Sequence, residues 1–160
     1  MNIEPLIVLT KIIAVREIIV ESVRKIAPIA RQTLQLSGTH SPTAILHTVS
    51  GFFPIVMSYE NPDEKKEVVE FVKKEALEKN AYAVTTITNS IIIDCRSGAC
   101  EESLVLATSI QGGQPYIVMQ KYARNGLGHV YSFHEMIEGE DAVVVGQMLI
   151  FPEWDRQTSH

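Results

Sequence analysis

The sequence lacks the many cysteines of a disulfide-rich secreted domain and the basic excess of a typical nucleic-acid-binding protein. It contains only two cysteines in 160 residues, too few for the disulfide framework that stabilises small secreted domains. Acidic residues number 19 and basic residues 14, which gives a net charge of -5 at pH 7. Without a basic excess there is no strong positive field to attract a phosphate backbone, so we expect no nucleic-acid partner.

Long hydrophobic runs are also missing. Lys11, Arg16, Glu17 and Glu21 interrupt the apolar residues near the N-terminus before about 18 of them accumulate, which excludes a membrane-spanning helix there. No cation precedes Lys11, whereas a secretory signal begins with a positively charged region. We therefore expect a soluble, cytoplasmic protein that has no membrane partner and keeps its thiols reduced.

What the sequence does contain is typical of one globular domain. Hydrophobic residues make up 46% and charged residues 21%, close to the averages for folded domains. A chain of 160 residues can bury enough surface to fold without a metal ion or a disulfide. We expect residues 1–160 to form a single domain in which residues 152–160 are a loosely held tail.

The N-terminal part, from Glu4 to Gln35, has the periodicity of a long helix. Its polar residues recur three and four apart, at Glu17, Glu21, Arg24, Pro28, Arg31 and Gln35. Apolar residues cover almost all the remaining surface, more than contact with one sheet requires. Pro28 lacks a backbone donor, so we expect a kink or a break there. The surplus apolar surface predicts a homo-oligomer, most simply a dimer, with the helix from Glu4 to Leu34 in or near the interface.

A second helix is predicted after Tyr59. Asn61 is suited to cap the helix, Pro62 to occupy its first position, and Glu64 to complete a capping box. An apolar stripe follows, with charged residues on the other face, so this helix is amphipathic and should pack on the sheet.

Strands account for most of the remaining chain. Runs rich in β-branched and aromatic residues predict strands at Ala44–Val49, Ile55–Tyr59 and Tyr82–Asp94. Pro54 favours the edge of a sheet. Two-residue hairpin turns are predicted at Gly112-Gly113 and Asn125-Gly126. The last run, Ala142 to Phe151, is apolar on both faces, which predicts an interior strand.

These elements predict an α+β fold. We expect a mainly antiparallel meander sheet of five to seven strands, with the long N-terminal helix and the second, amphipathic helix packed on it. With two-residue turns, Ser109 pairs with Tyr116 and Tyr122 pairs with His129. One sheet face then gathers Tyr116, Gln120, Tyr122, His129, Tyr131 and Phe133. These residues either line a small-molecule pocket or are ordinary core, and core is the favoured interpretation.

The two cysteines, Cys95 and Cys100, stand between two apolar runs. They resemble half of a zinc site that His129 and His134 would complete, but five residues along a strand place the histidines on opposite faces. A disulfide is geometrically easier, since a four-residue loop would set the Cα atoms about 5 Å apart. A reducing cytoplasm disfavours it. The favoured interpretation is two reduced thiols flanking a hairpin turn, with no metal ion and no cofactor.

No complete catalytic motif is present. The run HEMIE at residues 134–138 places Glu138 where the zincin motif requires a second histidine. Acid–base chemistry would have to be assembled in space, and the weak candidates are His47, His129, His134, Asp94, Glu101 and Glu102.

Two function classes remain from the sequence. The first is a non-catalytic binding or interaction domain that acts as a homo-oligomer, for which a small molecule is a further conceivable ligand. The alternative is a small hydrolase or nuclease-like enzyme with a histidine–carboxylate site. A histidine and a carboxylate that converge in a concave pocket would favour the alternative, and the first class is preferred.

Overall fold

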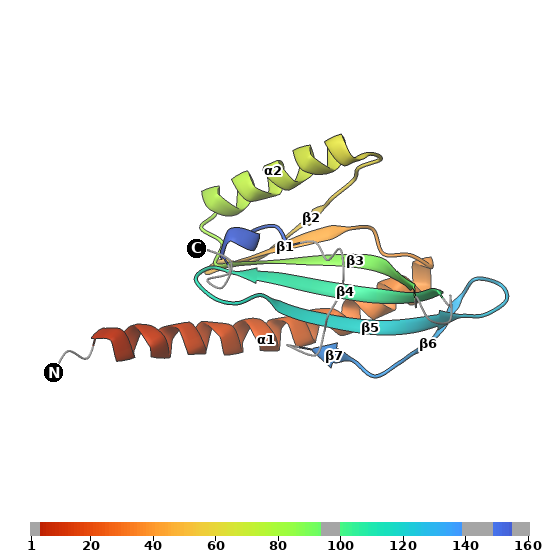
Figure 1. Cartoon of the computed structure of the whole chain (residues 1–160), viewed down its shortest axis with the longest axis horizontal. Helices are drawn as coiled ribbons and strands as arrows, with labels where there is room; N and C mark the ends of the chain where they lie inside the picture. The colour runs from red at the N-terminus through yellow and green to blue at the C-terminus, as the bar shows by residue number, and fades with distance from the viewer. Residues whose placement is uncertain (1–3, 94–99, 139–148, 155–160) are drawn as a thin grey trace.

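The computed structural model describes residues 4–93, 100–138 and 149–154, and for residues 4–14, 92, 93 and 100 it describes the backbone alone. The described chain forms two α-helices and a seven-stranded antiparallel sheet (Figure 1), so the predicted α+β fold class is confirmed. The elements are α1 (Glu4–Ser37), β1 (Thr43–Thr48), β2 (Gly51–Val56), α2 (Pro62–Glu78), β3 (Ala83–Ile93), β4 (Cys100–Ile110), β5 (Tyr116–Arg124), β6 (Val130–Phe133), β7 (Ile137–Glu138) and the short 3-10 helix η2 (Pro152–Trp154).

The sheet has the strand order β2-β1-β3-β4-β5-β6. Strand β7 also pairs with β5, at residues Val118 and Met119, whereas β6 pairs with its C-terminal end. Strand β2 lies at the edge, as Pro54 predicts. The Met57 amide donates to Pro42 O (2.7 Å), and backbone groups alternate in direction along a strand. The nitrogen of Pro54 therefore points to the open edge, where the missing N–H leaves no gap in the sheet.

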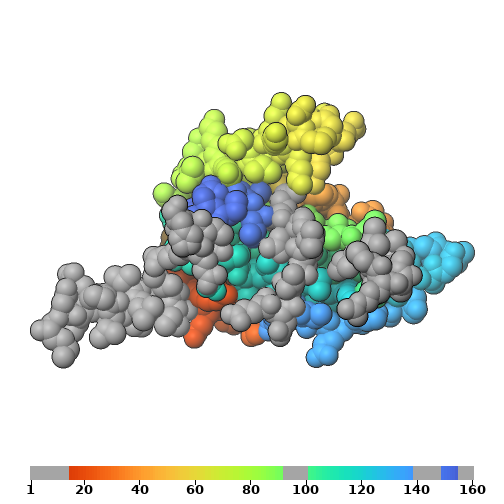
Figure 2. Space-filling model, in the orientation of Figure 1, coloured from red at the N-terminus to blue at the C-terminus, as the bar shows by residue number. Residues whose placement is uncertain are grey.

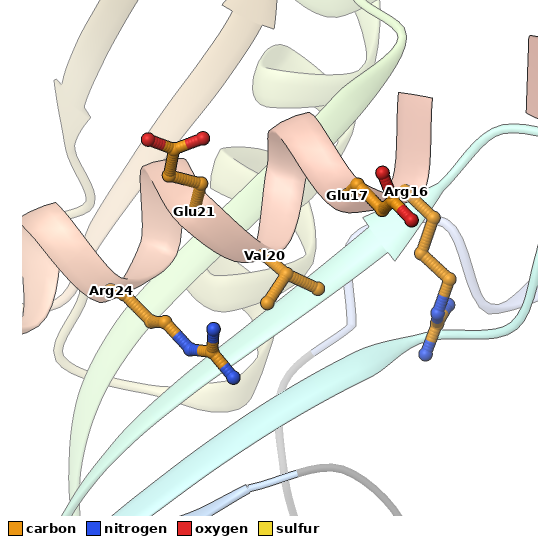
Figure 3. A pocket seen from close by; sticks show the side chains of 5 residues that line it. All are labelled: Arg16, Glu17, Val20, Glu21 and Arg24. Carbon is orange, nitrogen blue, oxygen red and sulfur yellow. The ribbon is translucent and has the colours of Figure 1, made fainter. Parts of the chain in front are cut away.

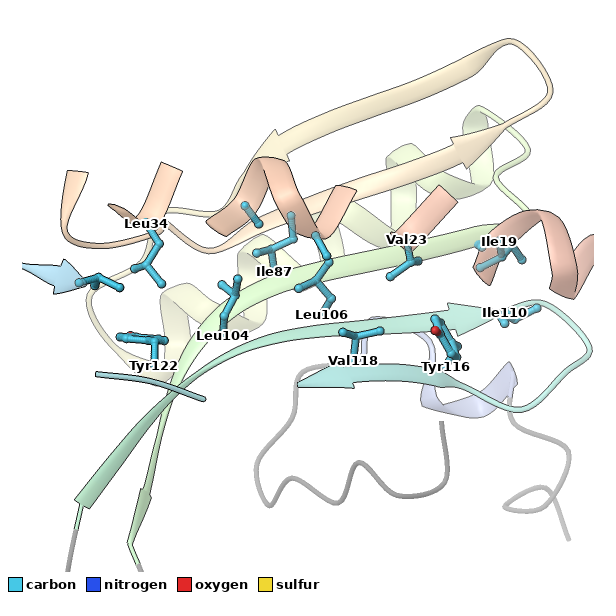
Figure 4. Packing of buried hydrophobic residues seen from close by; sticks show 14 residues of the cluster. Ile19, Val23, Leu34, Ile87, Leu104, Leu106, Ile110, Tyr116, Val118 and Tyr122 are labelled. Carbon is cyan, nitrogen blue, oxygen red and sulfur yellow. The ribbon is translucent and has the colours of Figure 1, made fainter. Parts of the chain in front are cut away.

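One face of the sheet packs against α1 (Figure 4). The helix contributes Ile19, Val23, Ala27, Ala30 and Leu34, all of them buried, to a core shared with strands β3 to β6. Of the kink or break expected at Pro28, the break is wrong, because α1 is continuous from Glu4 to Ser37. Pro28 lies on the exposed side of the helix, while the buried residues before and after it hold both halves on the sheet.

The opposite face packs against α2. The predicted cap is confirmed for Asn61 and Pro62: the Glu64 amide donates to Asn61 Oδ1 (2.8 Å), and Pro62 occupies the first helical position. The Glu64 side chain differs from the expected capping box, because its Oε2 accepts from the amide of Glu60 (2.7 Å), one residue before the cap. The helix buries Val72 and Ala76 over β1 and β3. In Figure 2 the dark blue atoms of residues 149–154 lie against α2, where Ile150 and Phe151 complete this core.

Two predicted strand registers are wrong. Thr108, not Ser109, pairs with Tyr116, because the turn begins one residue early: the Gly113 amide donates to Ile110 O (3.1 Å). Since a slip by one residue exchanges the faces, the leucines of β4 lie on the same face as Tyr116 and not on the opposite one. Tyr122 pairs with Phe133 rather than His129.

The β5–β6 loop explains the second error. It is closed by Asn125, whose Oδ1 accepts from the amides of Leu127 (2.9 Å) and His129 (3.0 Å). The left-handed residue is Gly128 (φ +82°) instead of Gly126. A bulge between Ala123 and Arg124 then brings Val130 into the α1 core and leaves Tyr131 exposed.

The cysteine prediction is tested only in part. Strands β3 and β4 form an antiparallel pair in which Cys100 stands opposite Ile93, and the hairpin, disulfide and zinc interpretations of Cys95 stay predictions. Cys95 and Asp94 lie outside the described residues, as does most of the predicted last strand. Its described end, residues 149–151, is not in a strand.

Candidate functional site

The first candidate base, His47, lies inside the protein. Its side chain is fully buried, and Nε2 is 2.7 Å from Thr85 Oγ1, which in turn is 2.7 Å from Thr108 Oγ1. Nδ1 has no hydrogen-bond partner among the described residues. Burial lowers the pKa of His47 to about 4, because the charged imidazolium would lose its hydration. A histidine without access to solvent cannot exchange protons with a substrate, so the structure gives His47 no catalytic surroundings.

The other two candidate histidines, His129 and His134, are exposed. His129 stands in the β5–β6 loop. His134 is one of the residues that line a polar hollow of about 300 Å³. The others are Glu101, Glu102, Lys121, Tyr122, Ala123 and Arg124. His134 and the candidate acids Glu101 and Glu102 therefore line the same hollow. Each carboxylate is already held by a cation, since Lys121 Nζ is 2.7 Å from Glu101 and Arg124 Nε is 2.6 Å from Glu102.

The predicted ligand-binding face is mostly packed beneath α1. Tyr116, Gln120 and Tyr122 are buried, and Phe133 packs against the same core. Gln120 accepts from Arg31 Nη1 (3.0 Å) and donates to His134 O (2.7 Å). His129 and Tyr131 point away into solvent. The structure thus divides this set between a hydrogen-bonded core and an exposed loop, an arrangement that suits core better than pocket.

Three arginines on one flank of α1 reach across the sheet, two of them to strands β5 and β7 and the third to the β4–β5 turn. Arg24 binds Glu138 of β7 with two hydrogen bonds, of 2.7 Å from Nη2 and 3.3 Å from Nε. Arg31 reaches Gln120, and Arg16 Nη1 donates to the backbone oxygen of Gln114 (2.8 Å). In the sequence, Arg24 and Arg31 belong to the recurring polar positions of the helix. Their partners in the strands are 114 and 89 residues away, so no local pattern could reveal these contacts.

Glu138 is shared between Arg24 and the buried Tyr116, whose hydroxyl also donates to it. Hydrogen bonds from Arg24 and then from Tyr116 lower the pKa of the Glu138 carboxyl. Burial, followed by the bond to Glu138, raises the pKa of Tyr116 to about 12. Both groups therefore keep their ordinary charge states near neutral pH, and the cluster ties α1 to β5 and β7 without offering an acid or a base.

A hollow of about 490 Å³ lies along the arginine flank of α1 (Figure 3). Its described lining is Arg16, Glu17, Val20, Glu21 and Arg24. Arg16, Val20 and Arg24 project from the same side of the helix toward the strands, whereas the Glu21 carboxylate points away from them. The sequence had not indicated this place, because the alternation of charged and apolar residues on α1 is ordinary for a surface helix.

The other flank of α1 is apolar and exposed. Ile18, Ile29 and Leu36, here called the apolar flank, are 54%, 65% and 79% exposed. Ile29 follows Ile18 by 11 residues, close to three helical turns, and Leu36 follows Ile29 by 7 residues, close to two turns. The three side chains therefore lie in one row along the helix. Because the arginines reach β5 and β7, this row is on the side toward β1 and β2. There the even-numbered residues of β2 also expose apolar side chains on the α1 face of the sheet: Phe52, Pro54 and Val56.

Neither a metal centre nor a membrane segment is found in the described part of the chain. No three histidine, cysteine or carboxylate groups of these residues stand close enough together to hold a metal ion. Among the same residues, no helix has a stretch of sufficient length and apolar character to cross a bilayer. The chain matches no protein-family model, and no curated protein or solved structure is similar to it.

Proposed function

We propose that this protein is a non-catalytic interaction domain that acts as a homo-oligomer, with α1 in the interface. The observation that carries the proposal is the apolar flank. Three large aliphatic side chains stand in one row on a helix, all more than half exposed, and β2 exposes Phe52, Pro54 and Val56 on the sheet face that α1 covers. Apolar surface of this extent over two elements marks an interaction site more often than a free surface.

A second copy is the partner that this surface suits. Two copies related by a twofold axis would bring the same apolar row together, which requires no second type of surface. Lys25 lies close to the row, but its ammonium pairs with Glu21 of the same helix (3.6 Å), so burial beside the row leaves no isolated charge. The open edge of β2 is unsuited to extend the sheet into another chain, because Pro54 has no N–H to donate there.

The mass of the protein in solution tests this proposal. We expect sedimentation equilibrium at micromolar concentration to give a multiple of 17.8 kDa, most simply a dimer. Ile29→Glu should give a monomer, since it places a charge in the centre of the apolar row. Leu127→Glu is the matched control, because Leu127 is 82% exposed in the distant β5–β6 loop. A monomeric wild type would overturn the proposal, and so would an Ile29→Glu variant that associates like the control.

The alternative, a small hydrolase or nuclease-like enzyme, is supported by the hollow at His134. Its weakness is chemical: Glu101 and Glu102 are each paired with a cation at 2.7 Å or less, and His47 is buried. A general base needs an accessible carboxylate or imidazole that can receive the substrate proton. We therefore keep the interaction domain as the preferred function.

A further inference from the structure

The hollow along the arginine flank has the size and chemistry of a small-ligand site. Its volume of about 490 Å³ lies within the range of about 300 to 1,000 Å³ that is usual for ligand pockets. Cationic side chains stand at its two ends and Val20 between them. Arg16 and Arg24 are eight residues apart, which places their helix positions about 12 Å apart along the axis.

The two arginines are not equivalent. Arg24 is neutralised by Glu138, to which it donates through Nη2 and Nε. Arg16 has no ion pair with a carboxylate of the described residues; its described hydrogen bond goes to a neutral carbonyl, Gln114 O (2.8 Å). A guanidinium has five N–H donors, so Arg16 retains donors and an uncompensated charge at one end of the hollow.

Arg16 is also held in place. Its guanidinium carbon is 6.0 Å from the centre of the Tyr116 ring, within the range of a cation–π contact. Tyr116 is itself buried and bonded to Glu138. A donor group that is positioned before a ligand arrives loses less conformational entropy on binding, so Arg16 is suited to receive an anion.

We propose that this hollow binds a small monoanion with an elongated apolar body, such as a medium-chain carboxylate. The carboxylate would bind Arg16, whose fork matches it with two hydrogen bonds, and the apolar body would lie over Val20 toward Arg24. One anionic group is expected because Arg24 is already paired. Glu17 and Glu21 also line the hollow, which disfavours a second negative charge on the ligand.

Titration with octanoate, followed by amide chemical shifts, tests this site in the full chain. We expect saturable shifts around Arg16 and Val20, with a Kd of about 1 mM for a ligand of this size. Octanamide, which has the same body but no charge, should bind about tenfold more weakly. Inorganic phosphate should bind more weakly than octanoate, since it has no apolar body.

Two variants and one control locate the site. Arg16→Gln can keep a bond to Gln114 O but loses the charge, and we expect octanoate affinity to fall about tenfold. Lys66→Gln is the control, because it removes one positive charge at an exposed position of α2, outside the lining, and its affinity should equal that of the wild type. If Arg16→Gln does not fold, Val20→Glu serves instead and should abolish binding. No saturation in the wild type, equal affinities for octanoate and octanamide, tighter binding of phosphate, or unchanged affinity in the folded variants would each overturn the proposal.

Discussion

Both sides of the sheet have apolar cores, but they satisfy their buried polar groups differently. On the α1 side, polar side chains bond to one another, in the pairs His47–Thr85, Thr85–Thr108 and Arg31–Gln120. On the α2 side, two buried hydroxyls bond to backbone atoms: Thr86 donates to Ala107 O (3.3 Å), and Ser109 accepts from the Phe151 amide (3.1 Å). A third, Ser103 Oγ, has no hydrogen-bond partner among the described residues.

This difference affects how each side responds to change. A bond to the backbone is fixed by the strand register, whereas a bond between side chains depends on two rotamers and, for histidine, on protonation. The α1 side also includes the Tyr116–Glu138–Arg24 cluster, which ties the helix to two strands. We therefore expect the two sides to resemble each other in their hydrophobic stabilisation and to differ in their sensitivity to pH and to single polar substitutions.

The largest effect should come from removing apolar volume, and it should be alike on both sides. Leu34 belongs to the α1 core and Leu46 to the α2 core, and both are fully buried. We expect Leu34→Ala and Leu46→Ala each to lower the free energy of unfolding by about 2 to 5 kcal/mol, measured by urea denaturation. Leu127→Ala, at an exposed position, should change it by less than about 0.5 kcal/mol. A loss in either core as small as that of the control would contradict the shared hydrophobic basis.

The second largest effect is a dependence of the free energy of unfolding on pH, which arises on the α1 side from the buried His47. The pKa of His47 is about 4 in the folded protein, against 6.5 for the unperturbed side chain. Between these values the unfolded chain binds more protons, so this histidine destabilises the fold as pH falls. The stability is fully present above pH 6.5 and is lost toward pH 4, with a maximum of about 3 kcal/mol. Urea denaturation at a series of pH values measures the slope.

A non-titrating residue at position 47 should remove that part of the slope. His47→Phe keeps an aromatic ring beside Phe52, whose ring centre is 5.2 Å from that of His47. The exposed His129 provides the control, since His129→Gln should keep the wild-type slope. If His47→Phe loses stability between pH 6.5 and pH 4 as steeply as the wild type, the buried histidine is not the cause.

The smallest effect concerns a single hydroxyl on each side. Tyr116 donates to Glu138 on the α1 side, so Tyr116→Phe should cost about 1 kcal/mol. Tyr59 packs against the α2 core, and its hydroxyl has no hydrogen bond to another described residue. Tyr59→Phe should therefore change the free energy of unfolding by less than about 0.5 kcal/mol. Equal costs for the two substitutions would remove the contrast in polar bonding.

Local chemistry explains which features the sequence could predict. The Asn61 cap of α2 depends on neighbouring residues alone, and the structure has Asn61 and Pro62 in the expected positions. Pro54 restricts its own strand to an edge for the same local reason. The turn at Gly112 was misplaced because two adjacent glycines permit several turns, and only Gly112 takes a positive φ (+73°).

The candidate sites depended on contacts that no local pattern contains. Gln120 could be predicted to need a hydrogen-bond partner, but not that Arg31 would supply it from α1. Likewise, Arg16 and Tyr116 are 100 residues apart in the chain, yet they contact each other at the end of the sheet. Sequence periodicity predicted the helix and its surplus apolar surface, while the pairing of its two flanks with different strands required the three-dimensional arrangement.

The outward-facing nitrogen of Pro54 limits how copies of this protein can grow into larger assemblies. An open strand edge with a complete row of amides can recruit another edge, then another, and so form fibres. In β2 that row is interrupted at its middle, so the interface that we propose consists of side chains on a helix and one strand. Contacts of that kind close after a fixed number of subunits when they are symmetric. The edge proline therefore prevents the proposed oligomer from extending through the β2 edge.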